Sequence, residues 1–68
     1  MDKRVYLEPR ERFDVAMIDE STALYSFTKI IDVLMAGGMS WMDSVDWYCY
    51  NIEPLIMYVG LNVEDDDG

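Results

Sequence analysis

The sequence predicts a small α+β domain, in which a short N-terminal β-hairpin is followed by two or three helices. Its 68 residues allow one domain at most. Alternating side chains near the N-terminus are typical of a strand, and two later segments carry apolar residues at helical spacing. An all-α fold, in which residues 13–20 are helical, is the alternative.

The predicted hairpin lies near the N-terminus. Residues 13–18 alternate in character, with Val15 and Met17 on one side, as expected for a strand. Residues 19–22 are turn-forming, and residues 24–27 form a second short extended piece. Because an isolated hairpin is only marginally stable, we expect a helix to pack on one of its faces.

The first predicted helix covers residues 27–36. Its apolar residues recur at i, i+3, i+4 and i+7, the spacing of a buried helical stripe; they are Phe27, Ile30, Ile31 and Leu34. Ser26 is the expected N-cap, because its hydroxyl can accept a hydrogen bond from the first helical turn. The Gly37–Gly38 pair is expected to end the helix.

A second helix is predicted to begin after its N-cap, Ser40, and to end near residues 52–53. Its core side reads Trp41, Val45, Tyr48 and Ile52. Pro54 is expected to end or kink this helix, because proline lacks a backbone N–H and disfavours helical geometry in the preceding residue. Residues 55–59 would then form a short final helix closed by Gly60.

These elements divide the chain into three predicted regions. Residues 1–12 are expected to be an irregular N-terminal arm, residues 13–60 the single small domain, and residues 61–68 an acidic tail. The tail ends in Glu-Asp-Asp-Asp-Gly, a composition that favours a solvated segment without a fixed structure.

Charge and composition exclude several classes of function. The chain has 14 acidic and 5 basic residues, a net charge of −9, and residues 30–68 contain eight acids and no base. Direct binding to nucleic-acid phosphates is therefore not expected. There is no His and one Cys, which removes His-dependent catalysis and His- or Cys-rich metal sites. We expect no enzymatic activity, no metal and no cofactor.

The sequence also bears on location. No apolar run is long enough to cross a membrane, and no signal peptide is visible at the N-terminus. A single cysteine supplies no disulfide framework. The expected location is cytoplasmic, without a membrane partner.

Candidate partner-binding residues lie mainly on the second predicted helix. They are Asp32, Asp43, Asp46, Trp47, Tyr50 and Glu53. Asp43, Asp46 and Glu53 recur with Tyr50 at i, i+3, i+7 and i+10, so they share one helix face. Trp47 is expected to be exposed beside them, and aromatic side chains among carboxylates suit an Arg-rich protein surface. The alternatives are an ordinary solvated acidic face and a Trp47 covered by the final helical segment.

Several segments carry a resemblance to known proteins. They are FDVA at 13–16, YSFTKIIDVLM at 25–35, GMS at 38–40, NI at 51–52 and YVG at 58–60. In this order they resemble a group of small phage and prophage proteins with the pattern FDEAI…YDYDK-IEILM…GM…N…YVG. The pattern is a fold signature without an assigned active site. The chain departs from it at residues 54–57 and in ending with acids where the group has an apolar strand.

The small size and strong acidity also resemble anti-CRISPR and other anti-defence proteins, many of which occupy nucleic-acid-binding surfaces. This resemblance implies a phage-encoded inhibitor in the host cytoplasm. Such an inhibitor would occlude a basic, nucleic-acid-binding host protein, most specifically a CRISPR–Cas effector subunit. Its acids would either imitate the phosphates of DNA or RNA or only complement a basic patch. The alternative is a structural or regulatory phage protein that self-associates as a homodimer and inhibits nothing.

Overall fold

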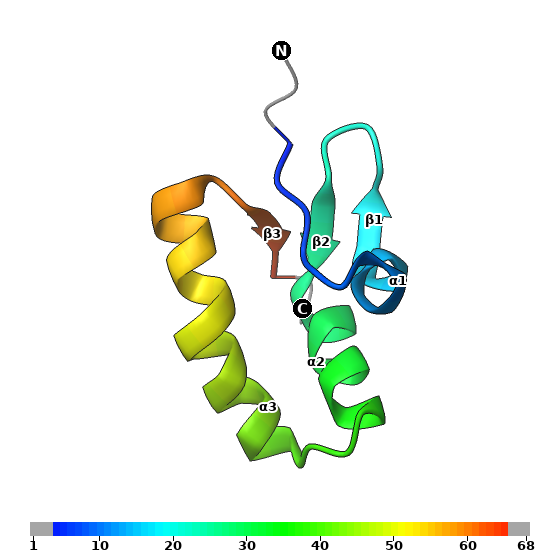
Figure 1. Ribbon diagram of the computed structural model, residues 1–68, viewed down its shortest axis with the longest axis vertical. Helices are drawn as coiled ribbons and strands as arrows, with labels where there is room; N and C mark the ends of the chain where they lie inside the picture. Colours follow the sequence, from blue (N-terminus) through cyan, green and yellow to red (C-terminus); the bar gives the residue numbers. More distant parts are fainter. Residues whose placement is uncertain (1–3, 66–68) are drawn as a thin grey trace.

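The computed structural model describes residues 4–65 and has the α+β architecture that the sequence predicts. A helix lies below a three-stranded sheet, and a longer helix runs along one side of both (Figure 1). In chain order the elements are α1 (Arg10–Phe13), the 3-10 turn η1 (Asp14–Ala16), β1 (Met17–Asp19), β2 (Leu24–Ser26), α2 (Phe27–Ala36), α3 (Trp41–Trp47), the π-helical segments η2 (Tyr48–Ile52) and η3 (Leu55–Val59), and β3 (Asn62–Glu64).

The sheet has the order β1-β2-β3, so β2 is its central strand. β1 and β2 form the predicted antiparallel hairpin, in which Met17 lies opposite Tyr25. The turn between them is held by Asp19, whose carboxylate accepts hydrogen bonds from the Ser21 backbone N–H at 2.9 Å and hydroxyl at 2.7 Å. β3 pairs with β2 in parallel, with Val63 opposite Tyr25. A parallel pair needs a long connection, and the helices between β2 and β3 supply it.

The first strand is shorter than the alternation predicts. Residues 13–16 are helical, because Phe13 and Ala16 lie three residues apart and both point into the core. Val15, which alternation placed on the buried side, is 70% exposed. The prediction of a strand over residues 13–18 is therefore wrong for its first four residues, and the strand begins only at Met17.

The ends of α2 and the start of α3 follow the predicted capping. The Ser26 hydroxyl accepts a hydrogen bond from the Lys29 N–H at 3.3 Å, and the Ser40 hydroxyl accepts one from the Asp43 N–H at 3.1 Å. Gly38, with φ of 110°, follows α2 in a conformation that favours glycine. The start and end of α2 and the start of α3 therefore lie where short-range backbone chemistry places them.

The second helix does not end before Pro54. Helical turns continue from Trp41 to Val59, and Figure 1 draws them as one ribbon labelled α3. The turn that approaches Pro54 is π-helical, with the Glu53 N–H bonded to the Tyr48 carbonyl, five residues back. This wider turn changes the position of the carbonyl that a proline ring would meet in an α-helix, so the helix accommodates it. Gly60 then ends the helix, as predicted, with φ of 99°.

Both predicted terminal regions contain ordered structure. Leu61 is buried and residues 62–64 form β3, so the acidic tail predicted from residue 61 begins with a strand, and Glu64 lies in that strand and not in an unstructured segment. The remainder of that tail, residues 66–68, and residues 1–3 of the arm lie outside the described residues. The rest of the arm is not wholly irregular, because α1 begins at Arg10 and Leu7 belongs to the core.

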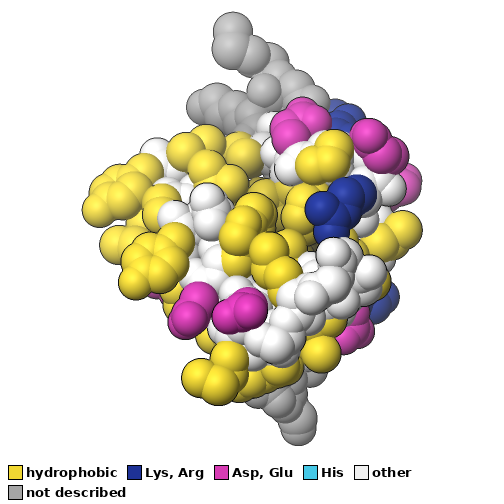
Figure 2. All heavy atoms as spheres, turned by 60° about the horizontal axis from the view of Figure 1, so that its bottom comes forward, with side chains coloured by type: hydrophobic (Ala, Val, Ile, Leu, Met, Phe, Trp, Pro, Cys, Tyr) yellow, Lys and Arg dark blue, Asp and Glu magenta, His cyan; other side chains and the backbone are white. Residues whose placement is uncertain are grey.

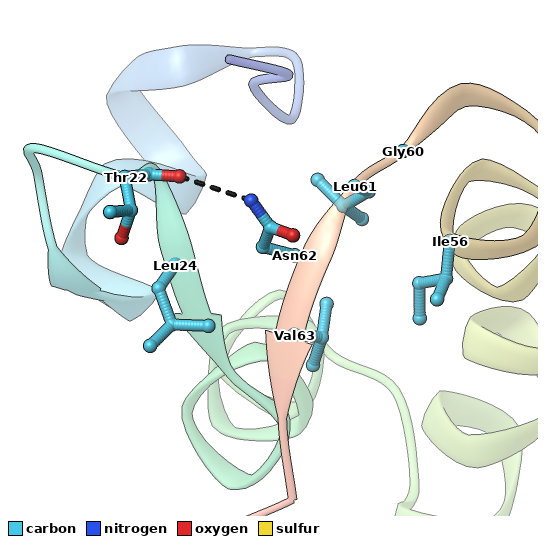
Figure 3. A pocket seen from close by; sticks show the side chains of 7 residues that line it. All are labelled: Thr22, Leu24, Ile56, Gly60, Leu61, Asn62 and Val63. Carbon is cyan, nitrogen blue, oxygen red and sulfur yellow. Dashed lines mark hydrogen bonds between the residues drawn. The ribbon is translucent and has the colours of Figure 1, made fainter. Parts of the chain in front are cut away.

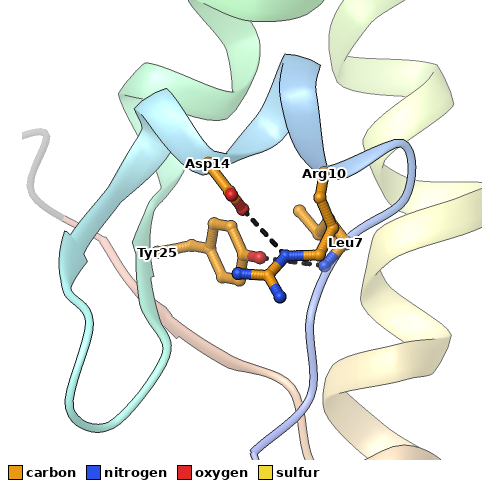
Figure 4. Close-up of polar contacts among 4 residues, drawn as sticks. All are labelled: Leu7, Arg10, Asp14 and Tyr25. Atoms are coloured by element: carbon orange, nitrogen blue, oxygen red, sulfur yellow. Dashed lines mark hydrogen bonds and ion pairs between the residues drawn. The ribbon is translucent and has the colours of Figure 1, made fainter.

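A buried hydrogen bond joins this N-terminal segment to the sheet (Figure 4). The backbone N–H of Leu7 donates to the hydroxyl of Tyr25, which is fully buried in β2, at 2.9 Å. Beside it, Arg10 donates to the Asp14 carboxylate at 3.3 Å, and its guanidinium lies 3.9 Å from the centre of the Tyr6 ring. The segment that precedes the hairpin is thereby fastened over the central strand.

The core contains residues from every part of the chain. Its buried apolar side chains are Leu7, Phe13, Ala16, Tyr25, Ile30, Ile31, Leu34, Tyr48, Ile52 and Leu61. The predicted stripe of α2 is confirmed, although Phe27 is only partly buried and contacts the Tyr48 ring edge-on at 4.8 Å. Trp41 was predicted on the core side of the next helix, but it is 59% exposed because Ser44 instead faces inward at this end.

Candidate protein-binding surface

The outer side of the long helix carries most of the predicted binding residues. Asp43, Asp46 and Glu53 are exposed, and Tyr50 is 80% exposed although it is a large aromatic side chain. The helical spacing predicts this arrangement, in which an exposed tyrosine lies on the same helix side as carboxylates. The structure therefore brings four of the six candidates onto one side of one helix.

Trp47 is not the exposed anchor that the sequence suggested. It is partly buried and packs against the core, with its ring stacked on Phe13 at 6.3 Å between centroids and 12° between planes. The alternative was a cover by the final helical segment, but the ring that stacks on Trp47 is Phe13 of α1, 34 residues away in the chain. Trp47 consequently contributes to stability, and its ring is not free for a partner.

Asp32, the remaining candidate, lies elsewhere. It is exposed on α2, whereas the other five candidates lie on the helical run that begins at Trp41. Its carboxylate adds negative charge to the molecule, but it does not belong to the face formed by Asp43, Asp46, Tyr50 and Glu53.

Two methionines belong to this surface and were missed by the sequence analysis. Met42 is 70% exposed and Met57 is 66% exposed. We define the outward stripe as Met42, Asp46, Tyr50, Glu53 and Met57, whose spacings of four, four, three and four residues keep them on one side of the helix. The helical spacing that predicted the acidic face also includes Met42, and it includes Met57 if the helix continues past Pro54.

The core-facing side of the same helix has a regular spacing. Ser44, Tyr48 and Ile52 are buried and recur every four residues, and Ile56 continues the series. In a regular α-helix a four-residue step drifts by about 40°, because there are 3.6 residues per turn. Wider π turns at Tyr48–Ile52 and Leu55–Val59 absorb this drift. The opposite side is thus held facing solvent along its length.

The two charged side chains of the stripe, Asp46 and Glu53, are both acidic. Partial desolvation raises the pKa of Cys49, and the charges of Glu53 and Asp46 raise it further. These two carboxylates therefore flank Cys49 in space, and its exposed thiol is protonated at neutral pH, which makes it a weak nucleophile. The surface is suited to contacting a positively charged group and not to covalent chemistry.

Two arginines of the N-terminal segment are engaged away from this surface. Arg10 is paired with Asp14, and Arg12 donates to the Val33 carbonyl near the end of α2 at 3.4 Å. Figure 2 shows the molecule from the end where α2 and α3 are joined. Hydrophobic side chains gather at the left, on the side of the long helix, with a small group of acidic side chains among them, whereas the Lys and Arg side chains in view lie at the right together with further acidic side chains.

An open groove lies on another part of the surface (Figure 3). It lies between the β2–β3 part of the sheet and the end of the helix, has a volume of about 590 Å³, and is lined by Thr22, Leu24, Ile56, Gly60, Leu61, Asn62 and Val63. No charged side chain lines it, and the Asn62 amide already donates to the Thr22 carbonyl at 3.2 Å. The outward stripe, which carries charged and exposed aromatic side chains, is the stronger candidate for function.

Within residues 4–65, no group of three or more acidic or Cys side chains is arranged to hold a metal ion. In the same part of the chain, no helix has the length and apolar character needed to span a membrane. No protein-family model matches the sequence, and no match is found among curated proteins or solved structures. The functional interpretation consequently depends on the surface itself.

Proposed function

We propose that this protein is an acidic, phage-encoded inhibitor that binds and occludes a basic, nucleic-acid-binding host protein. The observation that supports this most directly is the exposed acidic side of the long helix, where Asp46, Tyr50 and Glu53 face solvent together. An aromatic ring beside carboxylates can contact arginine through both cation–π attraction and charge pairing. The proposal assigns the protein no catalytic step.

The specific partner in this proposal is a subunit of a CRISPR–Cas effector in the host cytoplasm. Such a subunit must present Lys and Arg to nucleic-acid phosphates, and a surface of this kind complements a chain of net charge −9. The resemblance to small phage proteins and the class resemblance to anti-defence proteins favour this partner. Inhibition would be stoichiometric, because each bound inhibitor covers one basic surface.

A displacement assay tests the proposal. A purified effector complex is incubated with the protein, and its binding to labelled target DNA is measured by electrophoretic mobility shift. We expect loss of DNA binding at stoichiometric inhibitor, and a weaker effect at higher salt, because ions screen charge pairing. The triple variant D43K/E53K/D46K should abolish the inhibition, since it reverses every carboxylate on this side of the long helix.

A matched control reverses the same number of charges elsewhere. Glu8, Glu11 and Glu20 are exposed and lie outside the helix, so E8K/E11K/E20K changes net charge equally. This control should retain inhibition, with both variants checked for folding by circular dichroism. Inhibition that survives the helix triple, or that both triples abolish equally, would count against a specific acidic binding face. DNA binding unaffected by the wild-type protein would refute the proposed function.

The self-association alternative predicts a different result in solution. A homodimer would have to bury exposed apolar side chains such as Tyr50, Met57 and Tyr58, because Trp47 already packs on Phe13. Multi-angle light scattering distinguishes the two: the inhibitor proposal expects a monomer, whereas a salt-insensitive dimer would favour the alternative.

A further inference from the structure

The outward stripe is not uniformly acidic. From Met42 to Met57 its members alternate between an apolar side chain and a carboxylate, in the order Met, Asp, Tyr, Glu, Met. Each apolar member is at least 66% exposed. Exposed apolar side chains that gather on one surface and are bordered by polar residues mark protein interaction sites, whereas solitary ones do not. The apolar members therefore need an explanation as much as the acids do.

The density of charge along the helix distinguishes two kinds of partner. Asp43 and Glu53 are ten residues apart, which is about 15 Å at a rise of about 1.5 Å per residue. Over this length a DNA duplex carries roughly nine phosphate charges, and one strand roughly four, at one charge per about 1.7 Å of axis. The helix carries three carboxylates, Asp43, Asp46 and Glu53, in the same length. It has about a third of the charge density of duplex DNA.

The apolar side chains interrupt this charge where a phosphate backbone would continue. Tyr50 lies between Asp46 and Glu53 along the stripe, and a methionine lies beyond each acid. A cleft built only to hold phosphates would leave these apolar groups against strongly hydrated cations. A groove with an apolar floor and basic rims would instead cover the methionines and the tyrosine while pairing with the acids.

We propose that the outward stripe binds as a helix in an apolar, basic-rimmed groove of a partner protein, and that it does not imitate duplex DNA. Tyr50, Met42 and Met57 supply the affinity, because buried aromatic and flexible apolar side chains carry most of the energy of such interfaces. Asp46 and Glu53 set orientation and the rate of association. This inference rests on the stripe being the binding surface of the proposed function.

Two peptide probes of equal net charge test the inference. One is oligolysine, which offers charge alone, and the other is an amphipathic leucine–lysine helical peptide, which offers charge and an apolar face. Binding of each fluorescently labelled probe is measured by anisotropy. We expect the amphipathic peptide to bind at least about tenfold more tightly than oligolysine, and Y50A to weaken its binding by about tenfold, as for a hot-spot residue.

The control is V15A, which truncates an apolar side chain that is 70% exposed and lies outside the stripe. It should leave binding of the amphipathic peptide unchanged, and D46N/E53Q should weaken both probes. Equal affinity for the two probes, or no effect of Y50A, would overturn the inference.

Failure of the inference and failure of the proposed function are distinguishable. If the triple charge reversal abolishes inhibition of DNA binding but Y50A and M57A leave it unchanged, the function stands and the apolar groove is wrong. If the amphipathic peptide binds the stripe but the wild-type protein never displaces DNA, the groove-binding mode stands and the proposed function is wrong.

Discussion

Replacing Tyr25 by phenylalanine removes one atom, the hydroxyl oxygen that accepts the hydrogen bond from the Leu7 N–H. The ring still fills its place in the core, since Tyr25 is fully buried through its contacts with the N-terminal segment and the sheet. The Leu7 N–H is then left buried without its acceptor. The perturbation therefore isolates one polar contact between that segment and the central strand.

The magnitude follows from the burial of both partners. Leaving a buried donor unsatisfied costs about 1–3 kcal/mol, more than the net value of an ordinary hydrogen bond. Unfolding entropy near the melting temperature is about 2.1 cal/mol/K per residue, so a chain of this length loses roughly 7 °C in Tm per kcal/mol. We expect Y25F to lower Tm by about 7–20 °C.

Thermal unfolding followed by circular dichroism measures this shift, and urea unfolding at 25 °C provides an independent free energy. The matched control is Y58F, the same chemical change at a tyrosine that is 81% exposed, which should alter stability by less than about 0.5 kcal/mol. Equal Tm values for Y25F and wild type would refute the assignment of this hydrogen bond as a fastening of the N-terminal segment. A large loss in Y58F would refute the burial argument.

Three further predictions concern stability. The Ser44 hydroxyl is buried without a partner among the described residues, so S44A should raise the unfolding free energy by about 1 kcal/mol in urea titrations; a loss would contradict this. Burial raises the pKa of Tyr25 and Tyr48, so stability present below the ordinary tyrosine pKa of 10.0 should decline as pH rises above it. Alkaline melting curves check this, and Y25F should flatten the decline. Gly60 has φ of 99°, so G60A should cost about 1–2 kcal/mol, whereas G60N, which tolerates this region better, should cost less.

The sequence predicts an element boundary well where neighbouring residues determine it, and poorly where distant contacts do. Capping depends on a few neighbouring residues, so the two capping serines predicted the starts of α2 and α3, and Gly60 predicted the end of η3. The hairpin turn is local in the same sense. The helical stripe of α2 was readable because its core side repeats at 3.6 residues. The end of the second helix at Pro54 was mispredicted, since a π turn is not signalled by the spacing of apolar residues.

The candidate surface divides in the same way. The exposure of Asp43, Asp46, Tyr50 and Glu53 agreed with spacing along one helix, because neighbours on a helix face are determined locally. Met57 could be added only after the helix was known to pass Pro54.

The sequence by itself determined the fold class, the hairpin and the acidic face, because each depends on short-range periodicity or on charge counts. Only the tertiary structure decided which tryptophan packs against the core. Phe13 stacks on Trp47 while Trp41 is left in solvent, a choice made by the position of α1 and not by either residue's own neighbours. The pairing of β3 with β2 was decided in the same way, because a strand of three residues gains its stability from a partner far away in the chain.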